Sequence, residues 1–207
     1  IGHAMEGTGD VRFDEVALGR RGPRIEPYAV GVLAAEMQAV PSAQIERVLR
    51  RQEAVWSVDP ALSVDAREEA ARAYLALGTL LERGGHDAYT LHFGAVAGDG
   101  RFGRLPLAAA SALLDEGYGY SAEGDVATAA LVSVGQRLAG PAHFTEMYAM
   151  DFDADAVLLS HMGEGNPALA RADEPVRLAD RELGIGGLGR PATSVFRVRP
   201  GAGTPAS

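Results

Sequence analysis

Residues 118–138 carry the clearest structural pattern in the sequence. They read Tyr118-Gly119-Tyr120-Ser121-Ala122-Glu123-Gly124-Asp125 and continue into the apolar run Val126–Leu138. A short aromatic stretch, an acidic turn and then a run of helical character are typical of a strand followed directly by a helix. In α/β sheets, ligands collect where strands end and helices begin. A carboxylate there lies near a helix N-terminus, which favours its ionised form. The pattern therefore predicts that Glu123 lies at a ligand-binding edge.

The chain before this stretch alternates between helical and extended patterns. We expect strands and turns in residues 1–22 and a buried segment over 28–40 that could be helix or strand. Two helices follow, one capped by Ser42 that runs to Val55 and one that starts after Asp65 and ends at Gly84-Gly85. A strand over 88–93, a glycine-rich loop over 94–103 and a helix from Pro106 to Gly117 complete this part. Helices that alternate with strands indicate a largely parallel sheet. We therefore predict a Rossmann-like or flavodoxin-like α/β domain over residues 1–140.

The sequence pattern changes after Gly140, where helical periodicity gives way to short extended runs. The remaining residues contain short extended patterns separated by turns rich in Asp, Gly and Pro, and these are Phe144–Tyr148, Ala156–Ser160, Val176–Leu178 and Val195–Val198. We therefore predict a domain boundary near Gly140 and a β-rich partial domain over residues 141–207. Because so small a β-domain would be marginal alone, we expect this chain to be part of a longer protein.

Composition narrows the function classes. The 207 residues carry a formal net charge of −9, and all 19 basic residues are Arg. This sign argues against nucleic acid or an anionic membrane surface as the main partner. The chain has no Cys, which excludes thiolate zinc sites and cysteine nucleophiles. No apolar run approaches the ~20 residues that span a bilayer, and no secretory signal is visible. We therefore expect a cytoplasmic protein.

Three side chains at the edges of apolar runs could bind a metal: Glu123, Glu146 and His161. Taken alone, Glu123 could be a solvated glutamate and His161 a hydrogen-bonded core residue. Glu146 has the stronger individual case, because it lies within an extended run whose alternate residues can be buried, and buried carboxylates are usually paired or metal-bound. Two carboxylates and one imidazole suit Mn²⁺, Co²⁺ or Mg²⁺. The sequence thus predicts a divalent-metal site if the three side chains meet.

Several segments, in this order and at this spacing, resemble the L-arabinose isomerase family. They are Gly119–Asp125 with Thr128–Leu131, Phe144–Tyr148, Leu159–Met162 with Glu164 and Pro167, and Leu183–Gly187, with weaker similarity at Gly2–Met5, Ala88–Thr90 and Phe93. The similarity spans nearly the whole chain. The Glu-Gly-Asp and Ser-His-Met segments in register are its most specific part.

The resemblance implies an aldose–ketose isomerase of the L-arabinose to L-ribulose type that acts through an enediol and uses a divalent metal, usually Mn²⁺. Glu123, Glu146 and His161 would be the metal ligands, and the two glutamates would also be the acid–base pair. Positions that match the sugar pocket are Met5, Phe93, Leu183 and Ile185. The partner would be a small sugar. The resemblance also implies a homo-oligomer, a trimer or hexamer, for the full-length protein.

Departures from the family pattern leave alternatives open. By resemblance, the chain corresponds to the middle domain and the first part of the C-terminal domain. An N-terminal domain and a further metal-binding histidine lie outside it, so we expect the fragment alone to be inactive. Val126, His143 and His92 replace residue types usual in the family. A non-catalytic sugar-binding or regulatory protein on the same scaffold is the alternative. A metal hydrolase is a weaker one, since it predicts a second His/Asp cluster that the sequence does not display.

Overall fold

The structure is a computed structural model that describes residues 1–9, 11–184, 186–203 and 205. Helices alternate with short strands, and two of the strand pairs are parallel, which confirms the predicted α/β class. In chain order the elements are α1 (Glu15–Gly19), α2 (Val30–Ala39), α3 (Ser42–Val55), β1 (Ser57–Val58), α4 (Val64–Gly84), β2 (Ala88–Leu91), α5 (Phe93–Asp99), α6 (Leu107–Asp115), β3 (Gly119–Ala122), α7 (Val126–Ala139), β4 (Glu146–Asp151), β5 (Ala156–Ser160), η1 (Pro167–Leu169), β6 (Arg177–Asp180) and β7 (Ala192–Val195).

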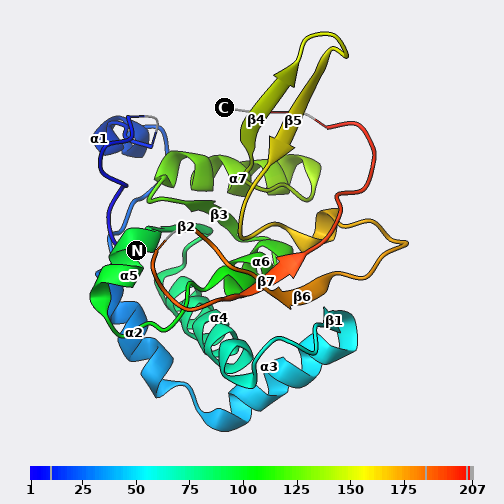
Figure 1. The fold of residues 1–207 in the computed structure, drawn as a ribbon. Coiled ribbons are helices and arrows are strands. Elements are labelled where there is room, and N and C mark those ends of the chain that lie inside the picture. Colours follow the sequence, from blue (N-terminus) through cyan, green and yellow to red (C-terminus); the bar gives the residue numbers. More distant parts are fainter. Residues whose placement is uncertain (10, 185, 204, 206–207) are drawn as a thin grey trace.

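A parallel pair of strands, β2 and β3, lies between two helical layers (Figure 1). Helix α7 covers one face of the pair, and α6 and α4 lie on the other. The strands run in register from Ala88 opposite Gly119 to Leu91 opposite Ala122. Gly119 permits the close approach of α7, because a Cβ atom there would meet the carbonyl oxygen of Ala129 at 2.3 Å. Since both strands end at one level, the residues that follow them emerge at a common edge.

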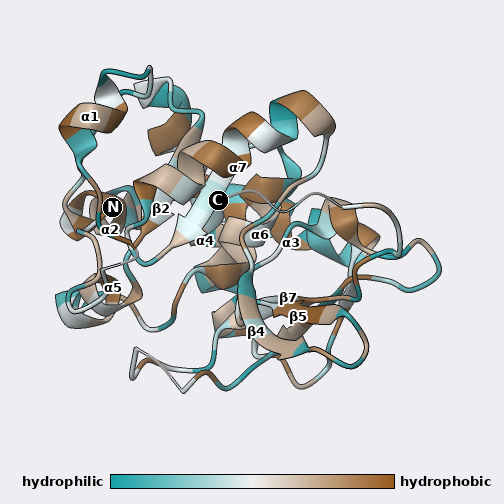
Figure 2. Cartoon of the chain, turned by 90° about the horizontal axis from the view of Figure 1, so that it is seen from above, coloured by the Kyte–Doolittle hydropathy of each residue, from teal (hydrophilic) through white to brown (hydrophobic). Residues whose placement is uncertain are grey.

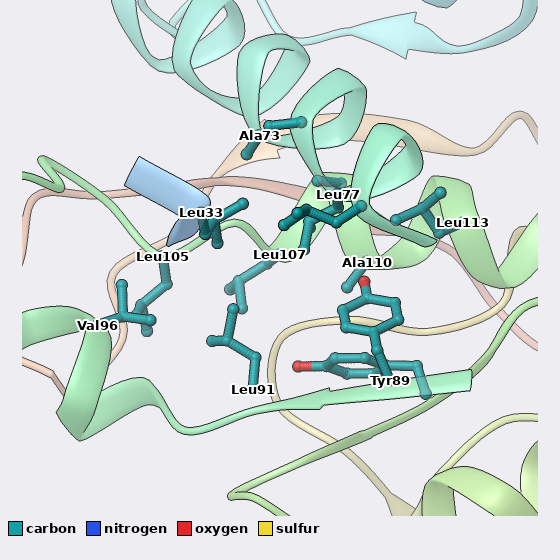
Figure 3. Packing of buried hydrophobic residues seen from close by; sticks show 14 of the residues in the cluster. Leu33, Ala73, Leu77, Tyr89, Leu91, Val96, Leu105, Leu107, Ala110 and Leu113 are labelled. Atoms are coloured by element: carbon teal, nitrogen blue, oxygen red, sulfur yellow. The ribbon is translucent and has the colours of Figure 1, made fainter. Parts of the chain in front are cut away.

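The main hydrophobic core lies on the opposite face of these strands (Figure 3). Tyr89 and Leu91 point from β2 toward Leu77 of α4 and toward Ala110 and Leu113 of α6. Period-two alternation along β2 gives this strand an apolar face for the core. This apolar face continues to the end of β2, so the core packs directly against the edge where β2 and β3 end.

Helix α4 has a defined cap at each end. The Ser63 hydroxyl accepts a hydrogen bond from the Ala66 N–H at 3.2 Å, and Gly85 ends the helix in the left-handed region with φ of 62°. A side-chain oxygen at the N-cap and a glycine at the C-cap satisfy backbone groups that the helix leaves unpaired. The expected end at Gly84-Gly85 is confirmed. The start after Asp65 was wrong, since Ser63 supplies the cap two residues earlier.

A second sheet joins the two halves of the chain. Strand β1 pairs in parallel with β6, and β6 pairs with β7 in the antiparallel sense. Leu178 of β6 and Ala192 of β7 pack with Leu62 and Ala66 in a second buried cluster. Strands β6 and β7 therefore pack onto elements that precede Gly140, so their position is set by the α/β core.

The hairpin of β4 and β5 extends away from the body (Figure 1). Its register shifts between Met147 and Ala149. Hydrophobic residues run along both strands (Figure 2). The large hydrophobic side chains of the hairpin are about half exposed or more, and they are Met147, Tyr148, Met150, Phe152, Val157, Leu158 and Leu159. A two-stranded hairpin is marginally stable without a further packing surface.

Other local expectations were wrong as well. Residues 93–99 form α5 instead of starting a glycine-rich loop, because full burial of Val96 offsets the roughly 1 kcal/mol that each helical glycine costs. Within residues 1–9 and 11–22 the only regular element is α1, with Asp14 as its cap, and no strand forms. Ser42 is the first residue of α3 and not its N-cap, which is Pro41.

Truncation of a core leucine tests this packing. Leu113 of α6 is 1% exposed, so we expect Leu113→Ala to lower the free energy of unfolding by about 2–5 kcal/mol through lost burial and a residual cavity. Leu138→Ala is the matched control, because Leu138 is 82% exposed and should change stability by less than about 0.5 kcal/mol. Urea unfolding followed by circular dichroism measures both. Equal effects would contradict the core described here.

Candidate active site

A cavity of about 170 Å³ opens at the edge where β2 and β3 end. Glu123, Glu146 and His161 all line it, together with apolar side chains that include Leu91, Phe93, Leu105, Leu107 and Leu183. Residues from distant parts of the sequence thus reach one small, mostly apolar space. Pockets of this kind, with a few polar groups that converge, are the usual form of ligand sites.

A larger cavity, of about 540 Å³, lies around the start of β2. Four of its polar side chains contact one another in two pairs. Arg137 forms an ion pair with Asp87, and the Tyr28 hydroxyl lies 3.0 Å from Nε2 of His86. None of the predicted site residues that the structure describes lines this cavity. The chemistry that the sequence predicts therefore belongs to the smaller space.

Glu123 is held by its backbone. Its N–H donates to the Leu91 carbonyl at 3.1 Å, and its own carbonyl accepts from the Met5 N–H at 2.8 Å. The residue has φ of 67°, a left-handed conformation that is uncommon for residues other than glycine and clusters at functional sites. Asp125 then caps α7 by accepting from the Thr128 N–H at 2.9 Å. This turn fixes Glu123 beside the N-terminus of a helix, as predicted from its place in the sequence.

His161 follows β5, and its side chain is 9% exposed. Nδ1 lies 3.8 Å from Oε2 of Glu146, and Nε2 lies 3.5 Å from Oε2 of Glu164. Neither nitrogen has a hydrogen-bond partner, although both are buried. Burial of the ring lowers the pKa of His161, but the carboxylates of Glu164 and Glu146 together raise it by more, so this pKa lies above its ordinary value. The imidazole is therefore a buried ring between two carboxylates that favour its protonated form.

Glu164 is the site residue that sequence reasoning missed. Its side chain is 5% exposed, and it lines the cavity beside Tyr120 and Tyr89. Burial raises the pKa of Tyr120 well above its ordinary value, and the negative charge of Glu164 adds to the effect. The spacing of three residues from His161 was a usable signal, but nothing in the sequence indicated that this glutamate is buried.

Glu146 is much more open than Glu164. It begins β4, and 41% of its side chain is exposed. Tyr148, two residues further along the strand, also lines the cavity, as expected for residues that share one face of a strand. A hydrogen bond with Glu146 raises the pKa of Tyr148. Glu146 thus borders solvent at the mouth of the site.

The structure places two of the four predicted pocket residues in the wall of the cavity. Phe93 and Leu183 line the cavity as parts of its apolar wall. Met5 is not among the lining residues that the structure describes, and its contact with the site is the backbone hydrogen bond to Glu123. Ile185 lies outside the described residues. The roles of all four in binding a substrate stay predictions.

The donors around the cavity fit a divalent metal in kind. Carboxylate oxygens and an imidazole nitrogen are ligands that Mn²⁺, Co²⁺ and Mg²⁺ accept. The buried, unpartnered nitrogens of His161 support this fit, because buried polar atoms are normally satisfied by some partner. Over the described residues, no three His, Asp or Glu side chains converge closely enough to hold an ion. The donors thus line the cavity but lie too far from one another to coordinate an ion together in this conformation.

An α/β protein with carboxylates and an imidazole in a cavity at its strand ends has the layout of an enzyme site. Comparison with known families makes the assignment specific. Residues 13–140 match the L-arabinose isomerase central domain, and residues 141–207 match the L-arabinose isomerase C-terminal domain. The chain belongs to the L-arabinose isomerase family, which confirms the resemblance inferred from its sequence.

Individual relatives agree with this assignment. The chain is 36% identical over 187 residues to the L-arabinose isomerase of Clostridium beijerinckii, a match that covers 88% of this chain and 37% of the relative. It is 34% identical over 197 residues to the L-arabinose isomerase of Yersinia pseudotuberculosis, with 90% of this chain and 39% of the relative covered. The chain thus spans less than two fifths of the length of the curated relatives it matches.

Substitution of Gly124 tests the turn that holds Glu123. Gly124 has φ of 82°, and a Cβ atom there would meet the His3 carbonyl oxygen at 2.4 Å and Cα of Ala4 at 2.5 Å. We expect Gly124→Ala to destabilise the fold by more than about 1 kcal/mol, because both the conformation and the backbone contact are unfavourable. Gly78→Ala in α4, where a Cβ atom meets nothing within 4 Å, is the control and should be neutral or stabilising. Thermal unfolding of both variants decides the matter, and a harmless Gly124→Ala would refute the tight turn.

Proposed function

We propose that this chain is part of a metal-dependent aldose–ketose isomerase that interconverts L-arabinose and L-ribulose. The observation that carries the proposal is the shared cavity of Glu123, Glu146 and His161 in a chain of this family. The relatives that bear the name L-arabinose isomerase support the choice of reaction. Because the chain covers only part of those relatives, the activity is proposed for the whole protein.

The carboxylates suit the proton transfers of such a reaction. Isomerisation moves one proton between C1 and C2 and another between O1 and O2 through an enediol. One of Glu123 and Glu146 would take the carbon proton and return it, and the other would move the hydroxyl proton. Glu123 is anchored through its backbone, so it can present its carboxylate in one place. Glu146 borders solvent, where a proton can be exchanged.

The cavity provides binding groups and an apolar wall. Glu123, Glu146 and His161 would hold Mn²⁺, or alternatively Co²⁺ or Mg²⁺, which would act as a Lewis acid toward the sugar oxygens. Phe93 and Leu183 line the space and would exclude water from the reacting carbons. Lower polarity strengthens every charge interaction within the site.

The proposal extends to assembly and location. Apolar side chains along the β4–β5 hairpin are exposed, and exposed apolar patches mark contact surfaces. They support the expectation of a homo-oligomer for the full-length protein, and a trimer or a hexamer is the assembly that the family resemblance implies. In the part of the chain that the structure describes, no helix is long and apolar enough to cross a membrane. A cytoplasmic location remains our proposal, with a small sugar as partner.

Activity of acid-deleted variants tests the chemistry. In the full-length protein with Mn²⁺ and L-arabinose, we expect Glu123→Gln and Glu146→Gln each to lower kcat by about 10²–10⁴-fold, since each removes a proton-transfer group and a ligand. Glu46→Gln is the control, because Glu46 is 66% exposed and lies on α3. Appearance of L-ribulose is the readout. Unchanged rates in both site variants would refute the assignment.

Removal of the metal separates this proposal from a non-catalytic sugar-binding protein. We expect a chelator to abolish turnover and Mn²⁺ to restore it. Isothermal titration calorimetry with L-arabinose gives the second readout. Sugar binding without any turnover, indifferent to metal and chelator, would favour the binding protein and contradict the isomerase.

A further inference from the structure

The His161 ring lies between two carboxylates that differ in burial. Nε2 faces Glu164, whose side chain is 5% exposed, at 3.5 Å. Nδ1 faces Glu146, whose side chain is 41% exposed, at 3.8 Å. A neutral imidazole donates from one nitrogen and accepts at the other. Neither approach has hydrogen-bond geometry in this structure, so the distance and burial of the two carboxylates decide which of them attracts the ring proton.

We propose that Glu164 is a positioning residue that accepts the N–H of His161 Nε2 and so leaves the Nδ1 lone pair directed toward Glu146 and the cavity. Ring nitrogens of metal-binding histidines commonly donate to a carboxylate in this way, which fixes the tautomer and the ring orientation. Glu164 therefore acts through His161. The inference deepens the proposed function, on which its consequence for metal binding rests.

The segment around Glu164 is fixed to the body of the protein. The N–H of Gly165 donates to Oγ of Ser111 at 3.2 Å. Asn166, which is 1% exposed, donates from its side chain to the carbonyls of Leu114 and Ala142 at 3.3 and 3.0 Å. These bonds join the segment to α6 and to the chain that follows α7. A carboxylate on such a support can hold an imidazole at a defined angle.

Burial gives Glu164 a reason to bind the ring. A buried carboxylate is costly unless donors surround it. Among the described residues that line the cavity beside Glu164, His161, Tyr120 and Tyr89 carry groups able to donate to it, and His161 is the one whose proton Glu146 can also accept. Glu146 can instead be stabilised by water, since it is partly exposed. The ring proton is therefore held better on the side of Glu164.

The tautomer of His161 tests the proposal directly. In the metal-free, full-length protein, long-range ¹H–¹⁵N spectra at a pH where the ring is neutral should place the proton on Nε2, with the signal assigned by its loss in His161→Gln. Glu164→Gln should shift the population toward Nδ1–H, because Glu146 is then the only carboxylate at the ring. Glu146→Gln should retain Nε2–H. An Nδ1–H tautomer in the unmodified protein, or one that Glu164→Gln leaves unchanged, would overturn the proposal.

Metal affinity supplies the second readout. By calorimetry, Glu164→Gln should weaken Mn²⁺ binding by about 10–100-fold, and Glu164→Asp, which keeps the charge, should lose less. Glu174→Gln is the control, since Glu174 is 41% exposed and pairs with Arg197, and it should bind as the unmodified protein does. Lower thermal stability with unchanged Mn²⁺ affinity would make Glu164 merely structural and overturn the inference. If the unmodified protein bound no Mn²⁺, the proposed function would fail, while the tautomer would still decide the role of Glu164.

Discussion

The in-register parallel pairing of β2 with β3 is the constraint on which the site depends. Because Leu91 and Ala122 are paired, Phe93 and Glu123 emerge from neighbouring strands within one or two residues of the same edge. The hydrogen bond from the Glu123 N–H to the Leu91 carbonyl continues the ladder one residue beyond β3. A shift of one residue would turn the side chains of a strand to its other face. The cavity exists because this register is kept by a core on one side and α7 on the other.

The negative charge of the cavity is the second constraint, and its repulsion destabilises the folded state. Glu123, Glu146 and Glu164 all line one small cavity whose other walls are largely apolar. Like charges in a space of low polarity repel one another. A proton shared by His161 offsets part of that repulsion. A divalent cation would offset more, which gives the proposed metal an electrostatic basis independent of the family assignment.

Local patterns predicted the parts of the structure that local physics determines. The end of α4 at Gly85, the strand β5 and the strand-to-helix turn at Glu123 followed from glycine conformation, alternation and capping. Helix α5 was missed because its glycines disfavour a helix, while burial of Val96 depends on distant partners. The gathering of Glu123, Glu146 and His161 was a hypothesis that depended on tertiary structure. Glu164 was noted only as part of the family resemblance and not as a site residue, since the burial of a glutamate is not encoded in its neighbours.

The two proposed acid–base residues are held very differently, and the difference has a physical origin. Glu123 sits in a turn bonded on both sides of its peptide unit and closed by the cap of α7. Glu146 begins a hairpin whose strands bond chiefly to each other and whose apolar residues are exposed. A two-stranded ribbon gains little stability by itself, so the position of Glu146 depends on whatever covers the hairpin. Glu123 and Glu164 are thus fixed by contacts with the α/β core, whereas Glu146 lies on a hairpin that only a further packing surface would stabilise.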